Sequence, residues 1–183
     1  MVYVLLADGF EEVEAICPID VLRRGGCDVR IVGVTGPVVT GSHGIAVSCD
    51  LVGKKAFSAL KGDPPEMIVL PGGMPGTSRL DAWAGTDAFI EATEKAGGYL
   101  AAICAAPSVL GKRGKLKGKA ASCYPGFEED LKDAHVSYDD VTVDGKVITA
   151  RGAGCAMKFG LALLGALRGE DVSSKIAEAV IYK

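Results

Sequence analysis

The sequence predicts an α/β domain with a mostly parallel sheet and helices on both of its faces. Its length of 183 residues suits a single domain, 1–183, with enough chain to bury a core. Short apolar runs, often β-branched, alternate with stretches whose apolar residues recur at helical spacing. Strands that are buried on both faces have near-continuous apolar sequences. This alternation therefore indicates parallel strands joined by helices.

The expected elements follow one another in this alternating order. Four apolar runs predict parallel strands, and they are Val2–Ala7, Asp28–Val34, Glu66–Leu70 and Tyr99–Ile103. Helical spacing of apolar side chains predicts four helices, and they are Glu12–Arg24, Ser78–Ala96, Gly154–Leu167 and Val172–Val180.

Two segments depart from the alternation, because each contains two β-like runs in succession. Val38–Thr40 and Ile45–Cys49 are separated by a Gly-Ser-His-Gly segment, which predicts a hairpin. A second hairpin is expected over Val141–Thr149, with Asp144-Gly145 as its two-residue turn.

Composition excludes several classes of function. The net charge is −3 and no basic block is present, which argues against nucleic acid or an anionic membrane as a partner. The six cysteines form no CxxC pair and there are only two histidines, so neither a disulfide framework nor a zinc site is expected. The apolar run Val2–Ala7 is too short to span a bilayer and lacks the basic start of a signal peptide. We therefore expect a cytoplasmic protein.

Three unusual stretches follow directly on expected parallel strands. They are Asp8–Glu14, Pro71–Gly76 and Cys104–Pro107. In open α/β sheets, ligands bind beyond the carboxyl ends of the strands, so the fold would bring all three stretches to one edge. Their convergence predicts a functional site there.

Cys104 stands where an apolar strand gives way to a helix start, in the segment AAICAAP. A sharp strand-to-helix turn presents a nucleophile outward and demands small neighbours, which Ala105 and Ala106 are. Pro107 is tolerated in a first helical turn. The positive helix end is expected to favour thiolate and to lower the pKa of the thiol. The alternative, a core cysteine that closes a buried strand, stays open.

Backbone and carboxyl groups of the other two stretches are candidates for the same site. Gly72 and Gly73 could offer free N–H groups to an oxyanion, although a Gly-Gly pair also suits an ordinary tight turn. Glu11, Glu12 and Glu14 begin the first helix, where complementing the helix dipole accounts for at least two of them. The third could point into the crevice with a raised pKa and move protons. The spacing does not decide which one.

Four motifs in register closely resemble the ThiJ/PfpI superfamily, in its Parkinsonism-associated deglycase (glyoxalase III-like) branch. They are LADGFEEVEAICPIDVLRRGG, VLPGGMPG, AAICAAPSVL and ITARGAG. The likeness runs from Val2 to beyond Leu167. It implies a flavodoxin-like α/β sandwich, and it also implies assembly as a homodimer.

The resemblance also implies roles for individual residues. It makes Cys104 the reactive, oxidation-prone thiol, and it makes Glu14 a protonated carboxylic acid that hydrogen-bonds to the sulfur. Gly72, Gly73 and Ala105 fall where backbone amides face the pocket. Two further residues fall near the dimer interface close to the site, and they are Arg24 and Glu11.

This sequence departs from the family pattern at three positions. Ala105 stands where the protease-like branch has histidine, which argues against a Cys-His protease dyad. Tyr124 stands in place of another histidine; its hydroxyl could donate a hydrogen bond but would not act as a base near neutral pH. His43 aligns with an anion-binding arginine, so it either approaches the partner subunit's pocket or is a solvated hairpin-tip histidine. Cys123, beside Tyr124, is either structural or a second oxidisable thiol.

Two hypotheses of function follow from these residues together with the family resemblance. In the first, the protein is a glutathione-independent, cofactor-free glyoxalase or deglycase. Cys104 attacks methylglyoxal or glyoxal, Glu14 moves protons, and water releases lactate or glycolate. In the second, the protein is a redox sensor or stress chaperone in which Cys104 is oxidised to sulfenic and then sulfinic acid.

Overall fold

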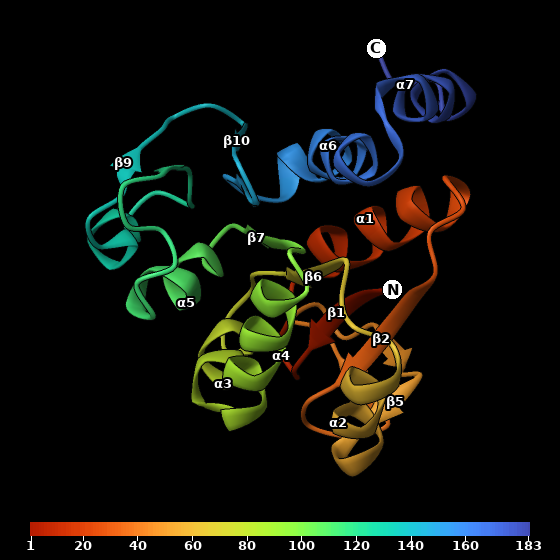
Figure 1. Ribbon diagram of the computed structural model, residues 1–183, viewed down its shortest axis with the longest axis vertical. Coiled ribbons are helices and arrows are strands. Elements are labelled where there is room, and N and C mark those ends of the chain that lie inside the picture. The colour runs from red at the N-terminus through yellow and green to blue at the C-terminus, as the bar shows by residue number, and fades with distance from the viewer.

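The computed structural model describes residues 1–183 and shows one sheet between two layers of helices (Figure 1). The sheet has seven strands in the order β10-β11-β7-β6-β1-β2-β5. Their bounds are β1 (Val2–Leu6), β2 (Val29–Gly33), β5 (Leu51–Val52), β6 (Met67–Leu70), β7 (Tyr99–Ile103), β10 (Val141–Asp144) and β11 (Val147–Ala150). Within this seven-stranded sheet only the β10–β11 pair is antiparallel. The predicted mostly parallel α/β sandwich is confirmed.

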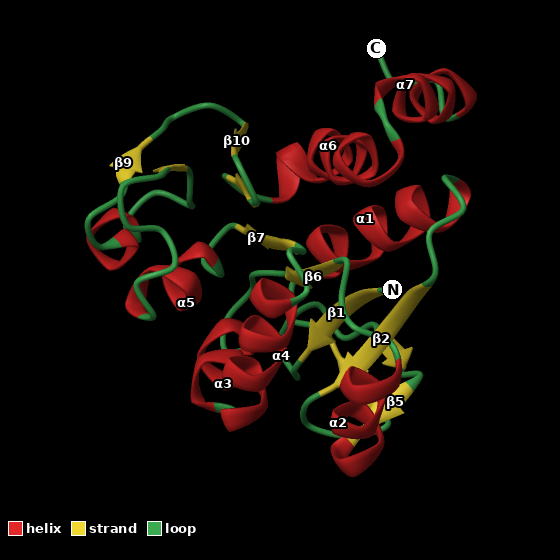
Figure 2. Cartoon of the chain, in the orientation of Figure 1, coloured by secondary structure: helices red, strands yellow, loops and turns green.

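Seven α-helices cover the two faces (Figure 2). They are α1 (Glu12–Arg24), α2 (Gly53–Gly62), α3 (Gly76–Ala82), α4 (Ala84–Lys95), α5 (Pro107–Lys112), α6 (Ala156–Arg168) and α7 (Glu170–Ala179). Smaller elements are β3 (Val38–Thr40), β4 (Ala46–Ser48), β8 (Ala120–Ala121), β9 (His135–Val136) and the 3₁₀ turns Glu128–Leu131 and Ala153–Cys155. No helix is long and apolar enough to cross a bilayer.

The alternation of side chains along β1 divides the core in two. Val2, Val4 and Leu6 point toward the layer that contains α1 and α6. Tyr3 and Leu5 point the other way, into the core beneath α2 to α5. Successive side chains of a strand face opposite sides of the sheet, so a central strand with helices on both sides must be apolar throughout.

The predicted helix Ser78–Ala96 is two helices, α3 and α4, which meet at Trp83. Extended backbone at Trp83 (φ −81°, ψ 116°) ends one helix and begins the next. This turn directs the indole to pack on Phe57 and Phe89, with ring centroids 5.6 and 6.0 Å away. The hydroxyl of Thr86 donates to the freed carbonyl of Leu80 at 2.6 Å. The break thus coincides with aromatic packing of Trp83, which the helical spacing does not reveal.

The hairpin β10–β11 forms where the sequence predicts it, but its turn is shifted by one residue. Asp144 pairs with Val147, so the two turn residues are Gly145 and Lys146 rather than Asp144 and Gly145. Gly145 takes φ +59°, which suits the first central position of a type II′ turn. The carboxylate of Asp144 instead accepts the backbone N–H of Ala120 at 2.9 Å. The other predicted hairpin forms as β3–β4.

Removing the ring of Phe159 tests the contribution of the α1–α6 layer to stability. The side chain is fully buried on α6, in the core shared with α1. We expect Phe159→Ala to lower the free energy of unfolding by about 3–5 kcal/mol in urea denaturation, because it leaves a cavity. Val143→Ala, at an exposed site, should change it by no more than about 0.5 kcal/mol. A small effect of Phe159→Ala would contradict this account of the core.

Candidate active site

The three stretches that follow β1, β6 and β7 meet at one edge of the sheet. The N–H of Glu11 donates to the carbonyl of Gly72 at 2.9 Å, which joins the first two stretches. A Cβ placed at Gly72 would lie 2.6 Å from the Cβ of Cys104 and 2.6 Å from Oε2 of Glu14. Only a glycine leaves room there for both side chains. The structure thus brings Cys104, Glu14 and the glycine pair together.

Cys104 occupies a strained backbone position directly after β7. Its φ is +66°, in the left-handed region that residues with a Cβ adopt rarely and at a cost. Two hydrogen bonds hold this conformation: its N–H donates to Ala150 at 2.9 Å, and its carbonyl accepts from Tyr124 at 2.8 Å. The half-buried thiol therefore projects from a sharp strand-to-helix turn, as a nucleophile elbow requires.

Glu14 is the acid of the first helix that faces the sulfur. Its side chain is buried, with the residue only 1% exposed, and its interaction with the thiol of Cys104 acts to lower its pKa. Its Oε2 also accepts the N–H of Gly72 at 3.0 Å. Burial disfavours the charged carboxylate and outweighs these hydrogen bonds, which raises the pKa of Glu14 to about 7.

The expected lowering of the thiol pKa is wrong for this site. Burial raises the pKa of Cys104 to about 12, and the adjacent charge of Glu14 acts in the same direction. The N–H groups of Ala105 and Gly73 face the sulfur and oppose the rise. The helix that was expected to favour thiolate, α5, has only six residues and begins at Pro107, which has no N–H to offer. Burial and the neighbouring carboxylate therefore outweigh the helix end.

The carboxyl and the thiol titrate as one unit, because each changes the charge that the other experiences. With one pKa near 7 and the other near 12, the pair holds a single proton over the range between them. That proton resides either on the sulfur or on the carboxyl oxygen. The second arrangement leaves a thiolate that accepts a hydrogen bond from a neutral carboxylic acid.

The two glycines have different roles. The N–H of Gly72 is committed to Glu14, so it holds the carboxyl and is not free for a ligand. Gly73 has φ +88°, and a Cβ there would lie 2.3 Å from the backbone nitrogen of Glu11. Its N–H and that of Ala105 both act to lower the pKa of Cys104. An oxyanion formed next to Cys104 would find these two donors.

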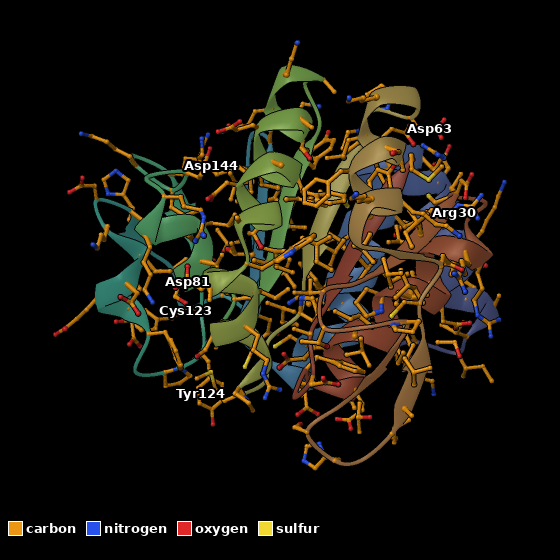
Figure 3. All side chains as sticks on the ribbon, turned by 90° about the horizontal axis from the view of Figure 1, so that it is seen from below. Arg30, Asp63, Asp81, Cys123, Tyr124 and Asp144 are labelled. Carbon is orange, nitrogen blue, oxygen red and sulfur yellow. The ribbon has the colours of Figure 1, made fainter.

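Tyr124 borders the site through its ring. It is 51% exposed and lies at the outer edge of the molecule, beside Cys123 (Figure 3). A Cβ at Gly152 would contact the Tyr124 ring at 3.4 Å and Oε1 of Glu14 at 3.9 Å. Gly152, which follows β11, is thus a boundary of the site that sequence reasoning missed; its place in the ITARGAG motif was the available signal.

Cys123 is buried, and burial raises the pKa of its thiol to about 11. The burial favours the structural alternative over a second oxidisable thiol, because oxidation requires access to the sulfur.

Glu12 and His43 are bound to each other at the tip of the β3–β4 hairpin. Nδ1 of His43 lies 2.9 Å from Oε2 of Glu12, and the backbone N–H of His43 donates to Oε1 at 2.8 Å. Burial opposes ionisation of Glu12, but these bonds and a longer one from the N–H of Ile45 prevail and lower its pKa to about 2. The same carboxylate raises the pKa of His43, whose side chain is 68% exposed. Glu12 therefore anchors the hairpin.

Glu11 and Arg24 do not reach the sulfur within this chain. Glu11 accepts the hydroxyl of Ser42 at 3.2 Å and thus faces the hairpin. Arg24 pairs with Asp20 at 2.6 Å in the last turn of α1, about 18 Å along the helix from its first residue. The residues that could hold a metal ion are Glu11, Glu12 and His43, whose ligand atoms lie within 4.8 Å of one another.

The sequence is similar to several characterised proteins along nearly its whole length. Protein dj-1beta of Drosophila melanogaster is 35% identical over 184 residues, covering 97% of this chain and 95% of the relative. A deglycase of Pyrococcus abyssi is 36% identical over 156 residues, covering 82% and 89%. The glutathione-independent glyoxalase DJR-1.2 of Caenorhabditis elegans is 30% identical over 168 residues, covering 91% and 87%.

A comparison with solved structures and a match to a family model agree with the sequence comparison. The structure of oxidised DJ-1 from Toxoplasma gondii superposes with a TM-score of 0.91 at 34% identity, covering 99% of this chain and 97% of that one. The model of the DJ-1/PfpI family matches residues 1–166. The resemblance seen in the four sequence motifs is thereby confirmed, and the chain belongs to the DJ-1/PfpI family.

Proposed function

We propose that the protein is a cofactor-free glyoxalase and deglycase that acts on small 2-oxoaldehydes such as methylglyoxal and glyoxal. The observation that carries the proposal is the buried carboxyl of Glu14 beside Cys104, where a Cβ at Gly72 would lie 2.6 Å from Oε2 of Glu14 and 2.6 Å from the Cβ of Cys104. The relatives named as a deglycase and as a glutathione-independent glyoxalase support the same activity. We also propose that it acts in the cytoplasm, where its six free cysteines stay reduced.

The reaction begins with addition of the thiolate to the aldehyde carbon of methylglyoxal. The sulfur–carbon bond forms, the carbonyl oxygen becomes an oxyanion, and the N–H groups of Gly73 and Ala105 stabilise it. Glu14 is the nearest proton donor, because it holds the proton that the thiolate form of the pair has lost. Protonation of the oxyanion gives a hemithioacetal on Cys104 and leaves Glu14 as a carboxylate.

The carboxylate of Glu14 then acts as a base. It removes the proton from the former aldehyde carbon to give an enediolate and returns that proton to the neighbouring carbon, while the hydroxyl proton of the hemithioacetal passes to the former ketone oxygen. The aldehyde carbon is thereby oxidised to a thioester and the ketone carbon reduced to an alcohol, so no external oxidant or reductant is needed. Water cleaves the thioester to lactate and restores Cys104. Methylglyoxal and one water yield lactic acid.

The same pocket could accept an early adduct in which an amine has added to the aldehyde carbon. Hydrolysis of that adduct consumes one water and releases the amine and lactate, which balances atoms and electrons in the same way. Tyr124, whose exposed ring borders the site, would then lie close to the incoming adduct. We include Tyr124 among the proposed substrate contacts for this reason.

The decisive assay is lactate production from methylglyoxal without glutathione. We expect turnover by the wild type, none by Cys104→Ser, and a rate lower by about 10²–10⁴-fold for Glu14→Gln, the usual contribution of a general acid–base group. Two variants away from the site, Cys49→Ser and Glu91→Gln, serve as matched controls and should retain the wild-type rate. Turnover that survives Cys104→Ser would refute the proposal.

The shared proton predicts how the reactivity of Cys104 depends on pH. Below pH 7 the pair holds both protons and lacks a nucleophile; as pH rises through about 7, one proton leaves and the thiolate form becomes available. The rate of alkylation of Cys104 by iodoacetamide, followed by mass spectrometry, should therefore rise with an inflection near pH 7. Glu14→Gln should abolish that inflection. A wild-type profile without a step near pH 7 would contradict the shared proton.

Oxidation of Cys104 is the second candidate function, as a redox sensor or stress chaperone. The half-buried, partly accessible sulfur lies beside a carboxyl that could hydrogen-bond to an oxidised product, which favours this reading. Among similar structures, that of Toxoplasma gondii DJ-1 is an oxidised form. If intact wild-type protein produced no lactate above buffer, this second function would become the better account.

We further propose that the chain forms a homodimer through the exposed face of α1. Val13 and Ile16 are 50% and 39% exposed there, and Ile45 on the adjacent hairpin is 58% exposed. With Cys17 and Met157 they line an apolar hollow of about 510 Å³. Apolar surface of this kind marks an interface. If two copies of α1 pair antiparallel, Arg24 of the second copy approaches the end of α1 that carries Glu11, so both residues are proposed interface positions.

A charge placed in this face should separate the protomers. We expect a dimer for the wild type in sedimentation equilibrium and a monomer for Ile16→Asp, because a carboxylate cannot be desolvated there without a partner. Val143→Asp, at an exposed apolar site on β10, is the control and should remain dimeric. A dimeric Ile16→Asp would exclude this face, and a monomeric wild type would exclude the assembly.

A further inference from the structure

Strand β11 holds the reactive turn from two adjacent residues. The carbonyl of Ala150 accepts the N–H of Cys104 at 2.9 Å, which fixes the start of the turn. The preceding residue, Thr149, is fully buried, and its hydroxyl oxygen accepts the backbone N–H of Ser122 at 2.9 Å. Both backbone edges of β11 are occupied by β7 and β10, so a side chain of the strand accepts this bond instead. The segment that begins at Ser122 is thereby tied to β11.

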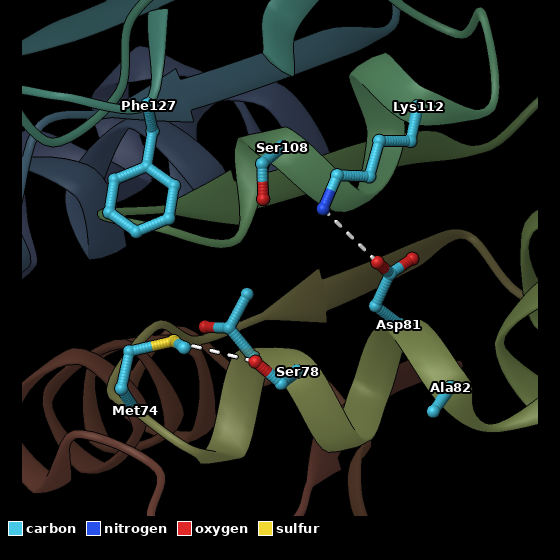
Figure 4. Close-up of a pocket in the computed structure, with 8 residues that line it drawn as sticks. Met74, Ser78, Asp81, Ala82, Ser108, Lys112 and Phe127 are labelled. Carbon is cyan, nitrogen blue, oxygen red and sulfur yellow. Dashed lines mark hydrogen bonds and ion pairs between the residues drawn. The ribbon is translucent and has the colours of Figure 1, made fainter.

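The tied segment reaches the reactive turn two residues later. The N–H of Tyr124 donates to the carbonyl of Cys104 at 2.8 Å. The far end of the segment is held as well, because the N–H of Phe127 donates to the carbonyl of Tyr124 at 3.2 Å. The ring of Phe127 lies above Met74 in Figure 4, at the edge of the hollow between α3 and α5. The position of the Tyr124 N–H thus depends on anchors at both ends of the segment.

The bond from Tyr124 orients the peptide unit between Cys104 and Ala105. A trans peptide is planar, and its C=O and N–H point in opposite directions. A donor that fixes the carbonyl of Cys104 on one side therefore fixes the N–H of Ala105 on the other. That N–H is one of the two donors proposed for the oxyanion. Ser108, seen on α5 in Figure 4, holds the next carbonyl, since its hydroxyl donates to Ala105 at 2.6 Å.

Ser122 and Thr149 form a polar pair inside an apolar core. Their hydroxyl oxygens lie 3.4 Å apart, and both residues are fully buried beside Ala121 and Val147 of the core beneath α2 to α5. A buried hydroxyl is unfavourable unless it is hydrogen-bonded. Thr142, directly across from Thr149 on β10, is also buried, but its hydroxyl has no partner. Of these two threonines, only Thr149 bonds to a segment that reaches the reactive turn.

We propose that Thr149 is a positioning residue for the reaction at Cys104. Its hydroxyl holds Ser122, the chain runs on to Tyr124, and the N–H of Tyr124 orients the peptide whose own N–H receives the oxyanion. The inference rests on the proposed function, because it assigns this residue a part in the same reaction. Thr149 is fully buried and cannot touch a substrate, so it acts on the geometry of the transition state rather than on substrate binding.

The first test measures kcat and KM for lactate production from methylglyoxal. Thr149→Val removes the acceptor of the Ser122 N–H; we expect kcat to fall about 10–10²-fold and KM to change less than about twofold, because the oxyanion contact forms only in the transition state. Thr142→Val, which removes an unpaired hydroxyl, should turn over as the wild type does. Thr149→Ser, which restores the acceptor, should recover most of the rate. A wild-type kcat in Thr149→Val, or an equal loss in Thr142→Val or Thr149→Ser, would overturn the proposal.

Amide hydrogen exchange tests the same link without any turnover. The Tyr124 N–H should be protected in the wild type, because it donates to the Cys104 carbonyl. Thr149→Val should speed its exchange at least about tenfold relative to the amides of β1, which report global unfolding, whereas Thr142→Val should not. Unchanged relative exchange in Thr149→Val would overturn the inference. If the wild type made no lactate, the proposed function would fail, and the exchange of the Tyr124 amide would still decide whether Thr149 positions the turn.

Discussion

The burial of one carboxyl against one sulfur is the constraint on which the site depends. Glu14 is held by the N–H of Gly72, and the space that it shares with Cys104 exists because position 72 carries no side chain. Burial makes ionisation of the carboxyl and of the thiol unfavourable, and so the pair retains one proton across neutral pH. A site that offers either a nucleophile or a proton donor needs a thiol and a carboxyl that share one proton in this way.

The surrounding backbone gives this pair its geometry. Cys104 is held at a positive φ by hydrogen bonds to Ala150 and Tyr124, which come from other segments of the chain. The same sharp turn aims the N–H of Ala105 at the sulfur, and the N–H of Gly73 reaches it from the neighbouring strand end. Two short segments therefore place the sulfur and these donors together.

Three acids at the start of one helix have three different roles. Glu14 faces the sulfur, Glu12 anchors the β3–β4 hairpin through His43, and Glu11 reaches Ser42 of the same hairpin. Their pKa values follow their surroundings: burial without a cation raises that of Glu14, and hydrogen bonds from the hairpin lower that of Glu12. A shared position near the helix dipole does not account for either shift.

The sequence by itself determined the alternation of strands and helices, the bounds of α1, and the meeting of three stretches at one sheet edge. Apolar periodicity carries that information locally, and parallel topology then dictates which strand ends meet. The spacing of the three acids did not single out Glu14, which the family resemblance named, and tertiary structure alone decided the break at Trp83 and the raised pKa of Cys104. Each depends on aromatic packing, burial or a charge supplied by residues distant in the chain. The spacing of residues along the sequence does not reveal these contacts.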